Sequence, residues 1–146
     1  MKDDSQKPIR VVLADDHVVV RKGIREFLEE DAAIRVVAEA SDGEGAVALV
    51  AREQPDVAVF DIQMPRLTGL DAARRVKEEF PNTHVLMLTA YEEEPFVFAA
   101  LRAGAHGCLL KTASSQELIH AVRAIAGGET ALSPAVVKKL VQPADD

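Results

Sequence analysis

Two kinds of segment alternate along the chain. Short, continuously apolar runs recur five times, at Val11–Ala14, Val36–Ala38, Val57–Phe60, Val85–Leu88 and Gly107–Leu110. Continuous apolar runs are typical of strands that are covered on both faces. Between the runs, apolar residues return at helical spacing, as at Val20/Ile24/Phe27/Leu28, Val47/Val50/Ala51, Phe96/Ala100/Ala103 and Leu118/Val122/Ile125. The pattern predicts strands and helices in alternation.

Polar residues mark where several of these helices begin and end. Ser114 followed by Glu117 is a capping-box signature, and Thr68 with Asp71 is a looser version of it. The glycine pair that starts at Gly127 ends the last helix. Five strand–helix repeats predict an α/β fold, with a doubly wound parallel sheet and helices on both faces.

Composition limits the possible classes of protein. The chain has 146 residues, 48% of them hydrophobic, and a net charge of −7, which fits one acidic domain with one core. No apolar run approaches the length of a membrane span, and residues 1–8 lack the apolar core of a secretory signal. The single cysteine, Cys108, excludes an intramolecular disulfide and a multi-cysteine zinc site. We expect a cytoplasmic protein without broad affinity for nucleic acid.

Polar side chains follow four of the five apolar runs: Asp15 and Asp16, Asp61, Thr89, and Lys111. Ligands of open parallel sheets bind beyond the carboxyl ends of the strands, where the strand order reverses. If the order is 2-1-3-4-5, these side chains share one pocket. Two carboxylates about 4 Å apart repel by roughly 4 kcal/mol at an effective dielectric near 20, so such a pocket needs Lys111 and a divalent cation such as Mg²⁺. A carboxylate beside Mg²⁺, an ammonium and a hydroxyl is a plausible phosphoryl acceptor.

At these residues the chain resembles the receiver domain of two-component response regulators. The resemblance rests on VVLADDH, VAVFDIQMPRLTGLDA, VLMLTAY and ALRAGAHGCLLK, which begin at Val11, Val57, Val85 and Ala100. DDH and GETALSP are similar to the NarL/FixJ subgroup, in which a receiver precedes a DNA-binding helix-turn-helix domain. The resemblance covers residues 9–128 and implies the flavodoxin-like five-stranded sheet of order 2-1-3-4-5.

The resemblance also implies a role for each site residue. Asp61 would accept a phosphoryl group from a sensor histidine kinase. Asp15, Asp16 and the backbone carbonyl of Gln63 would hold Mg²⁺ together with Asp61. Thr89 and Lys111 would contact the phosphoryl group, and Gln63 and Tyr91 would border it. The domain would be a signalling module with only slow self-phosphorylation and self-dephosphorylation, not an enzyme, and phosphorylation would switch a transcriptional output, with a possible homodimer.

Two positions depart from the pattern of the family. Cys108 stands where many receivers have an aromatic switch residue, and a thiol is too small to fill that space. Thr112 stands where a proline with a cis bond is frequent, and we expect a trans bond here. By this reading residues 1–8 form a tail, and residues 129–146 form a linker or a short helix from Ser133. The 18 residues after Gly128 leave no room for a DNA-binding domain, so DNA contact would need a domain that is absent from this chain.

Other interpretations stay open. A haloacid-dehalogenase-like phosphatase needs Asp-x-Asp after its first strand, where this chain has Asp15-Asp16-His17. A flavin carrier needs a hydroxyl-rich loop there, and a pseudo-receiver would bind without phosphorylation. Asp15 could cap the first helix, and we expect a solvated or structural role for His17. We expect Cys108 to be a buried apolar residue, and the valines of residues 18–20 to pack inside rather than form a dimer surface with the last helix.

Overall fold

The computed structural model describes residues 7–90 and 99–132 of the chain. The strands are β1 (Ile9–Ala14), β2 (Ile34–Ala40), β3 (Val57–Asp61), β4 (His84–Thr89), β5 (Gly107–Leu110) and β6 (Ala131–Leu132). The helices are α1 (Val18–Glu29), α2 (Gly43–Glu53), α3 (Gly69–Glu79) and α5 (Ser115–Ala126), and residues 99–102 are also helical. Each predicted strand is present.

All strand pairs are parallel, and the sheet has the order β2-β1-β3-β4-β5-β6. The chain therefore moves outward from β1 to β2 and then returns to the other side of β1, so the strand order reverses between β1 and β3. The prediction of five strands was incomplete, because Ala131 and Leu132 form a sixth strand beside β5 within the expected linker. A strand of two residues is too short to show a hydrophobic period.

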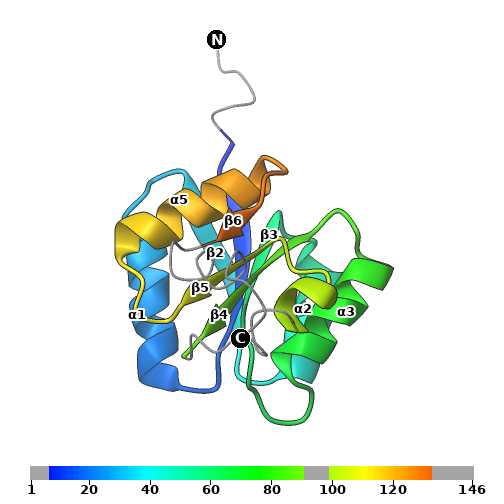
Figure 1. Ribbon diagram of the computed structural model, residues 1–146. Coiled ribbons are helices and arrows are strands. Elements are labelled where there is room, and N and C mark those ends of the chain that lie inside the picture. The colour runs from blue at the N-terminus through cyan, green and yellow to red at the C-terminus, as the bar shows by residue number, and fades with distance from the viewer. Residues whose placement is uncertain (1–6, 91–98, 133–146) are drawn as a thin grey trace, which may run out of the picture.

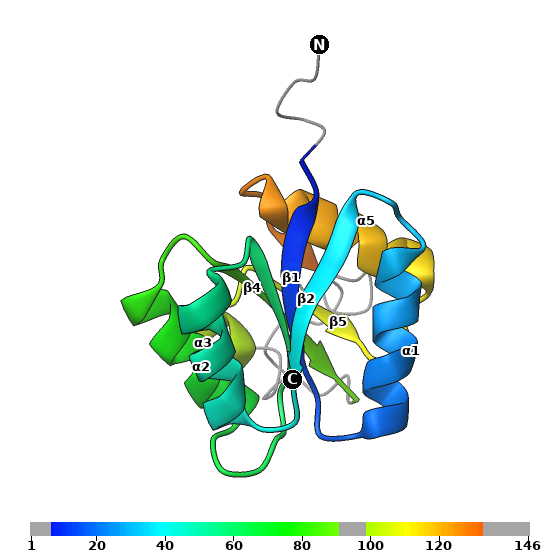
Figure 2. The same cartoon turned by 180° about the vertical axis from the view of Figure 1, so that it is seen from behind.

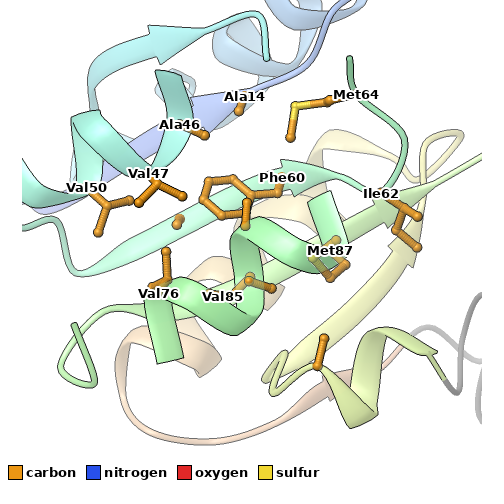
Figure 3. Close-up of a cluster of buried hydrophobic side chains, with 14 of the residues drawn as sticks. Ala14, Ala46, Val47, Val50, Phe60, Ile62, Met64, Val76, Val85 and Met87 are labelled. Atoms are coloured by element: carbon orange, nitrogen blue, oxygen red, sulfur yellow. The ribbon is translucent and has the colours of Figure 1, made fainter. Parts of the chain in front are cut away.

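Helices cover both faces of the sheet, with α1 and α5 on one side and α2 and α3 on the other (Figures 1 and 2). Against α2 and α3, Phe60 lies among apolar side chains that include Val76 and Met87 (Figure 3). On the other face, Leu13 and Leu86 pack with residues of α1 and α5. Each fully buried aliphatic or aromatic side chain contributes about 1.5–3 kcal/mol, and burial on both faces explains why the runs are continuously apolar.

The predicted helix ends are confirmed by their hydrogen bonds. The Ser114 hydroxyl accepts from the Glu117 amide at 3.1 Å, and the Glu117 carboxylate accepts from the Ser114 amide at 2.9 Å. The Thr68 hydroxyl accepts from the Asp71 amide at 3.2 Å, and α5 ends at Gly127. These caps satisfy amides that have no partner inside their own helix.

One expectation about α1 was wrong. Val18 and Val19 are 64% and 83% exposed, and Val20 is also exposed, instead of packing inside. The buried positions of this helix are Ile24 and Leu28, which pack against the sheet in the core. The first turn of α1 therefore presents apolar side chains to solvent.

Two further points concern the described part of the chain. No peptide bond within it is cis, so the bond before Thr112 is trans as expected. None of its helices is long and apolar enough to cross a membrane. Of the helical stripe predicted at Phe96, Ala100 and Ala103, the two alanines are buried, whereas Phe96 lies outside the described residues, as does the expected helix from Ser133.

Candidate functional site

The carboxyl ends of β1, β3, β4 and β5 meet at one cleft of about 360 Å³. Asp61 and Thr89 are the last residues of β3 and β4, and Asp15 and Lys111 directly follow β1 and β5. The cleft is lined by Asp16, His17, Asp61, Ile62, Gln63, Met64, Pro65, Thr89, Ala90 and Lys111. The parallel sheet thus brings the predicted strand-end residues together from four separate parts of the chain.

Lys111 joins the two most buried carboxylates of the site. Its Nζ lies 2.9 Å from Asp15 Oδ2 and 3.0 Å from Asp61 Oδ2. Asp15 is 1% exposed and Asp61 is 6% exposed, so both charges are largely removed from water. Neither carboxylate would stay ionised at this depth without a nearby cation.

The pKa values of this pair follow from burial and from the ion pairs. Burial raises the pKa of Asp61 above its usual value, although the hydrogen bond and the charge of Lys111 oppose the rise. Burial alone would lower the pKa of Lys111, but its hydrogen bonds to Asp15 and Asp61 raise it above the usual value. Lys111 is therefore a permanent cation at neutral pH, and Asp61 is a carboxylate whose charge is held in a poorly solvated place.

Backbone hydrogen bonds fix the two buried carboxylates in place. Asp15 Oδ1 accepts from the His17 amide at 2.8 Å, and Asp61 Oδ1 accepts from the Gln63 amide at 3.3 Å. The residue that precedes α1 is His17, whose side chain makes no capping bond. Asp15 therefore does not serve as the N-cap of α1.

The loop after Asp61 is held against the start of α3. The Gly69 amide donates to the Ile62 carbonyl at 2.7 Å. A Cβ on Gly69 would lie 1.9 Å from the backbone oxygen of Asp61, so any side chain there would displace the backbone of Asp61. This close approach explains why glycine follows Thr68 in the chain.

The donor set fits a divalent cation. Asp15, Asp16, His17 and Asp61 offer ligand atoms that all lie within 4.8 Å of one another. One ammonium does not balance three carboxylates, and carboxylate oxygens are the ligands that Mg²⁺ prefers. The deeply buried Asp15 supports the fit. Its Oδ2 lies 2.9 Å from Lys111 Nζ and its Oδ1 accepts from the His17 amide, and an ionised carboxylate has about four lone-pair sites, so these two partners leave acceptor capacity for a cation.

Sequence reasoning missed His17. Its Nδ1 lies 3.2 Å from Asp16 Oδ1 and 3.4 Å from Asp15 Oδ1, so the imidazole closes one side of the acidic cluster. The available signal was its place directly after Asp15 and Asp16. That signal was given less weight than the lack of metal-ligand spacing among the histidines.

Two predicted residues are not part of the cleft as described. Cys108 is fully buried in the core against α2 and α3, as expected for a small apolar residue, and burial raises its pKa to about 11. Tyr91 lies outside the described residues. Asp15, Asp16, Asp61, Gln63, Thr89 and Lys111 are the predicted site residues that the fold brings together.

A doubly wound α/β domain with a buried aspartate–lysine site at its switch point is the class of protein that these observations define. The family model of the response regulator receiver domain matches residues 11–123. The chain therefore belongs to the response regulator receiver family.

Similar proteins agree with this assignment. The chain is 41% identical over 133 residues to the transcriptional regulatory protein YxjL of Bacillus subtilis, covering 91% of this chain and 61% of that protein. Among solved structures, a LuxR-family two-component response regulator from Aurantimonas superposes with a TM-score of 0.86 at 32% identity, covering 93% of this chain and all of that one. The regulator RcsB, solved as two dimers bound to two DNAs, superposes with a TM-score of 0.83 at 26% identity, covering 92% of this chain and 68% of that chain. The chain spans about three fifths of the length of the curated relatives that it matches, such as YxjL.

Proposed function

We propose that the chain receives a phosphoryl group on Asp61 from a sensor histidine kinase, in a reaction that requires Mg²⁺. The observation that carries the proposal is the Lys111 ammonium, which lies between Asp15 and Asp61 at the floor of an open cleft. The Asp61 carboxylate thus has a cation beside it and is accessible to a phosphoryl donor through the cleft. Both conditions are needed by a nucleophile that attacks an anionic phosphoryl group.

Each site residue takes one role in this proposal. Asp15, Asp16, Asp61 and the Gln63 carbonyl would hold Mg²⁺, which when bound supplies positive charge beside the phosphoryl oxygens. Lys111 stabilises charge on the opposite side, and the Thr89 hydroxyl donates to a phosphoryl oxygen. Gln63 borders the cleft and limits the access of water, and we assign the same role to Tyr91. The fully buried Cys108 leaves the aromatic step of the family's switch without its usual side chain.

The chemical step is a simple displacement. A carboxylate oxygen of Asp61 forms the new O–P bond while the P–N bond to the kinase histidine breaks. The leaving imidazole nitrogen keeps the bonding electron pair and takes up a proton from solvent, which gives a neutral histidine. Loss of the phosphoryl group to water is slow in this proposal, so the domain signals rather than turns over a substrate.

Acetyl phosphate provides a direct test, because it is a small donor that needs no kinase. The protein would be incubated with Mg²⁺ and acetyl phosphate, and its intact mass measured. We expect one phosphoryl adduct on the wild type and none on Asp61→Asn. The matched control is Asp56→Asn, which removes an exposed carboxylate at the opposite end of β3 and should be labelled like the wild type. Equal labelling of Asp61→Asn would overturn the assignment of the acceptor.

The names and lengths of the relatives support a proposal about the response that the receiver controls. Their names include transcriptional regulatory proteins that are longer than this chain, so we infer that a DNA-binding domain beyond these residues carries the transcriptional response in the cytoplasm. The receiver would control that domain by shifting between two conformations when Asp61 is phosphorylated.

The exposed apolar turn of α1 supports a second part of the proposal, which is a homodimer formed on phosphorylation. Val18 and Val19 are largely exposed, and Phe27 is 40% exposed. Val19→Glu should abolish a phosphorylation-dependent increase in molecular mass, measured by light scattering with acetyl phosphate. Ala48→Glu places the same charge on an exposed position of α2, across the sheet, and should leave the increase intact. A monomeric phosphorylated wild type would contradict the dimer.

A further inference from the structure

The side chain of Arg21 connects α1 to the backbone of the acidic pair. Its Nη1 donates to the Asp15 carbonyl at 2.7 Å, and its Nε donates to Glu39 Oε1 at 2.9 Å. The side chain is only 17% exposed, although it belongs to the second turn of a surface helix. Arg21 therefore forms a bridge between the carboxyl end of β1 and the edge strand β2.

The carbonyl that Arg21 binds belongs to the peptide that joins Asp15 to Asp16. That peptide is planar, so fixing its oxygen also fixes the direction in which Asp16 leaves the strand. The Asp15 amide donates to the Ala40 carbonyl at 3.1 Å, so this residue is held on both sides. The backbone bonds of α1 begin with the Arg21 amide and the His17 carbonyl, so they do not reach Asp15. The guanidinium supplies the hydrogen bond that the helix does not.

Glu39 holds Arg21 in this position and is shared with a second arginine. Arg25, one helical turn later, donates from its Nη1 to the other carboxylate oxygen of Glu39. Burial alone would raise the pKa of Glu39, but the bonds from Arg25 and Arg21 hold it below the usual value. Glu39 is thus charged at neutral pH and orients both guanidinium groups. Only Arg21 also reaches the acidic pair.

We propose that Arg21 is a positioning residue that holds the Asp15–Asp16 turn in the geometry required to bind a divalent cation. This inference rests on the proposed function, because it assigns to Arg21 a role in the cation site of that function. Arg21 acts through the backbone of Asp15 and touches neither the cation nor the phosphoryl group. Groups that orient metal ligands contribute strongly to affinity, and their loss weakens binding by about tenfold to a hundredfold.

Mg²⁺ titration of matched variants tests the proposal. Wild type, Arg21→Gln and Arg25→Gln would be titrated with Mg²⁺ and followed by calorimetry or by amide chemical shifts. Both variants lose one positive charge and one bond to Glu39. Arg25→Gln also loses the bond of Arg25 to Glu29, so the control loses as many side-chain contacts as Arg21→Gln but none to the acidic pair. We expect Arg21→Gln to bind Mg²⁺ about tenfold more weakly, and Arg25→Gln to bind within about twofold of the wild type. If Arg21→Gln does not fold, Arg21→Lys compared with Arg25→Lys carries the same test.

Labelling by acetyl phosphate adds a second readout that a purely structural role would not change. In Arg21→Gln the Mg²⁺ concentration for half-maximal labelling should rise by the same factor, whereas the rate at saturating Mg²⁺ should remain that of the wild type. Equal Mg²⁺ affinity in the Arg21 and Arg25 variants would overturn the role of Arg21 while leaving the proposed function intact. A wild type that neither binds Mg²⁺ nor becomes labelled would instead overturn both.

Discussion

Replacing Lys111 by methionine removes the ammonium that lies between the two buried carboxylates and keeps a side chain of similar length. Lys111 Nζ lies 2.9 Å from Asp15 Oδ2 and 3.0 Å from Asp61 Oδ2. At about 3 Å and an effective dielectric near 20, each attraction amounts to about 5.5 kcal/mol before the cost of desolvation is subtracted. Removing one partner of a buried pair typically costs about 3–5 kcal/mol, since the remaining charge is left unpaired. We expect a loss near the lower end, about 3 kcal/mol, because a carboxyl group without its partner can take up a proton.

The pH dependence of Lys111→Met separates this electrostatic loss from lost packing. Burial raises the pKa of Asp61, and Lys111 opposes that rise, so the variant should have a still higher pKa at Asp61. Above the usual value of 3.8 the folded variant then binds more protons than its unfolded chain. The free energy of unfolding must therefore fall as the pH rises through this window, and acidification from neutral pH to about pH 5 should restore part of it. Mg²⁺ should stabilise the variant more than the wild type, because it binds only the folded state and meets less positive charge there.

Urea unfolding of Lys111→Met and wild type, with and without Mg²⁺ at both pH values, measures these effects. Arg123→Met is the matched control, since the Arg123 Nε lies 2.6 Å from Asp31 Oδ2 but its side chain is 52% exposed. Despite the shorter distance we expect a much smaller loss for this exposed pair. If Lys111→Met unfolds at the wild-type urea concentration at neutral pH without Mg²⁺, or if acidification does not restore stability, then Lys111 does not stabilise the fold through its charge.

Three other predictions follow from individual side chains. Gly69→Ala should lower the free energy of unfolding in urea by at least about 3 kcal/mol, because its Cβ would lie 1.9 Å from the Asp61 carbonyl oxygen. In the control Gly23→Ala the new Cβ meets nothing within 4 Å and should raise the free energy of unfolding by about 0.5–1 kcal/mol, so equal effects would contradict the clash. Burial lowers the pKa of His106 below 6.5, so its contribution to stability is present above that pH and is lost as the pH falls through the lower pKa of the folded state. His106→Asn should therefore flatten the pH dependence of the unfolding free energy between about pH 7.5 and 5.5, and an unchanged slope would contradict this role of His106. The Cys108 thiol, with a pKa raised from 9.0 to about 11, should react with a disulfide reagent about a hundredfold more slowly than an unburied thiol, and rapid reaction before unfolding would show that it is accessible.

The fold was predictable because the strands of a parallel sheet that is covered on both faces appear in the sequence as continuous apolar runs. A strand such as β3 is buried on both faces, so every one of its residues before Asp61 is apolar, and this continuous run indicates a buried strand. β6 shows the opposite case. Its two residues belong to the sheet through hydrogen bonds to β5, and backbone hydrogen bonds carry no signature in side-chain type. The exposed valines of α1 were misread because periodicity identifies an apolar face without telling whether the fold has room to cover it.

The site was predictable only where its function requires a particular residue type at a strand end. Asp15, Asp61 and Lys111 each follow an apolar run. Because the sheet is parallel, the carboxyl ends of its strands lie at one edge, so the position of a residue at the end of a run predicts its place in the site. Arg21 has no such marker, since an arginine on an amphipathic helix is ordinarily solvated. Arg21 is turned toward the site by Glu39 of β2, whose charge orients the guanidinium. The residues that we propose to contact the cation and the phosphoryl group are thus marked locally in the sequence. Arg21, which we propose to orient them, depends instead on a contact between distant elements. Comparing the Arg21 and Arg25 variants measures that difference, because both arginines carry the same sequence signal and share Glu39.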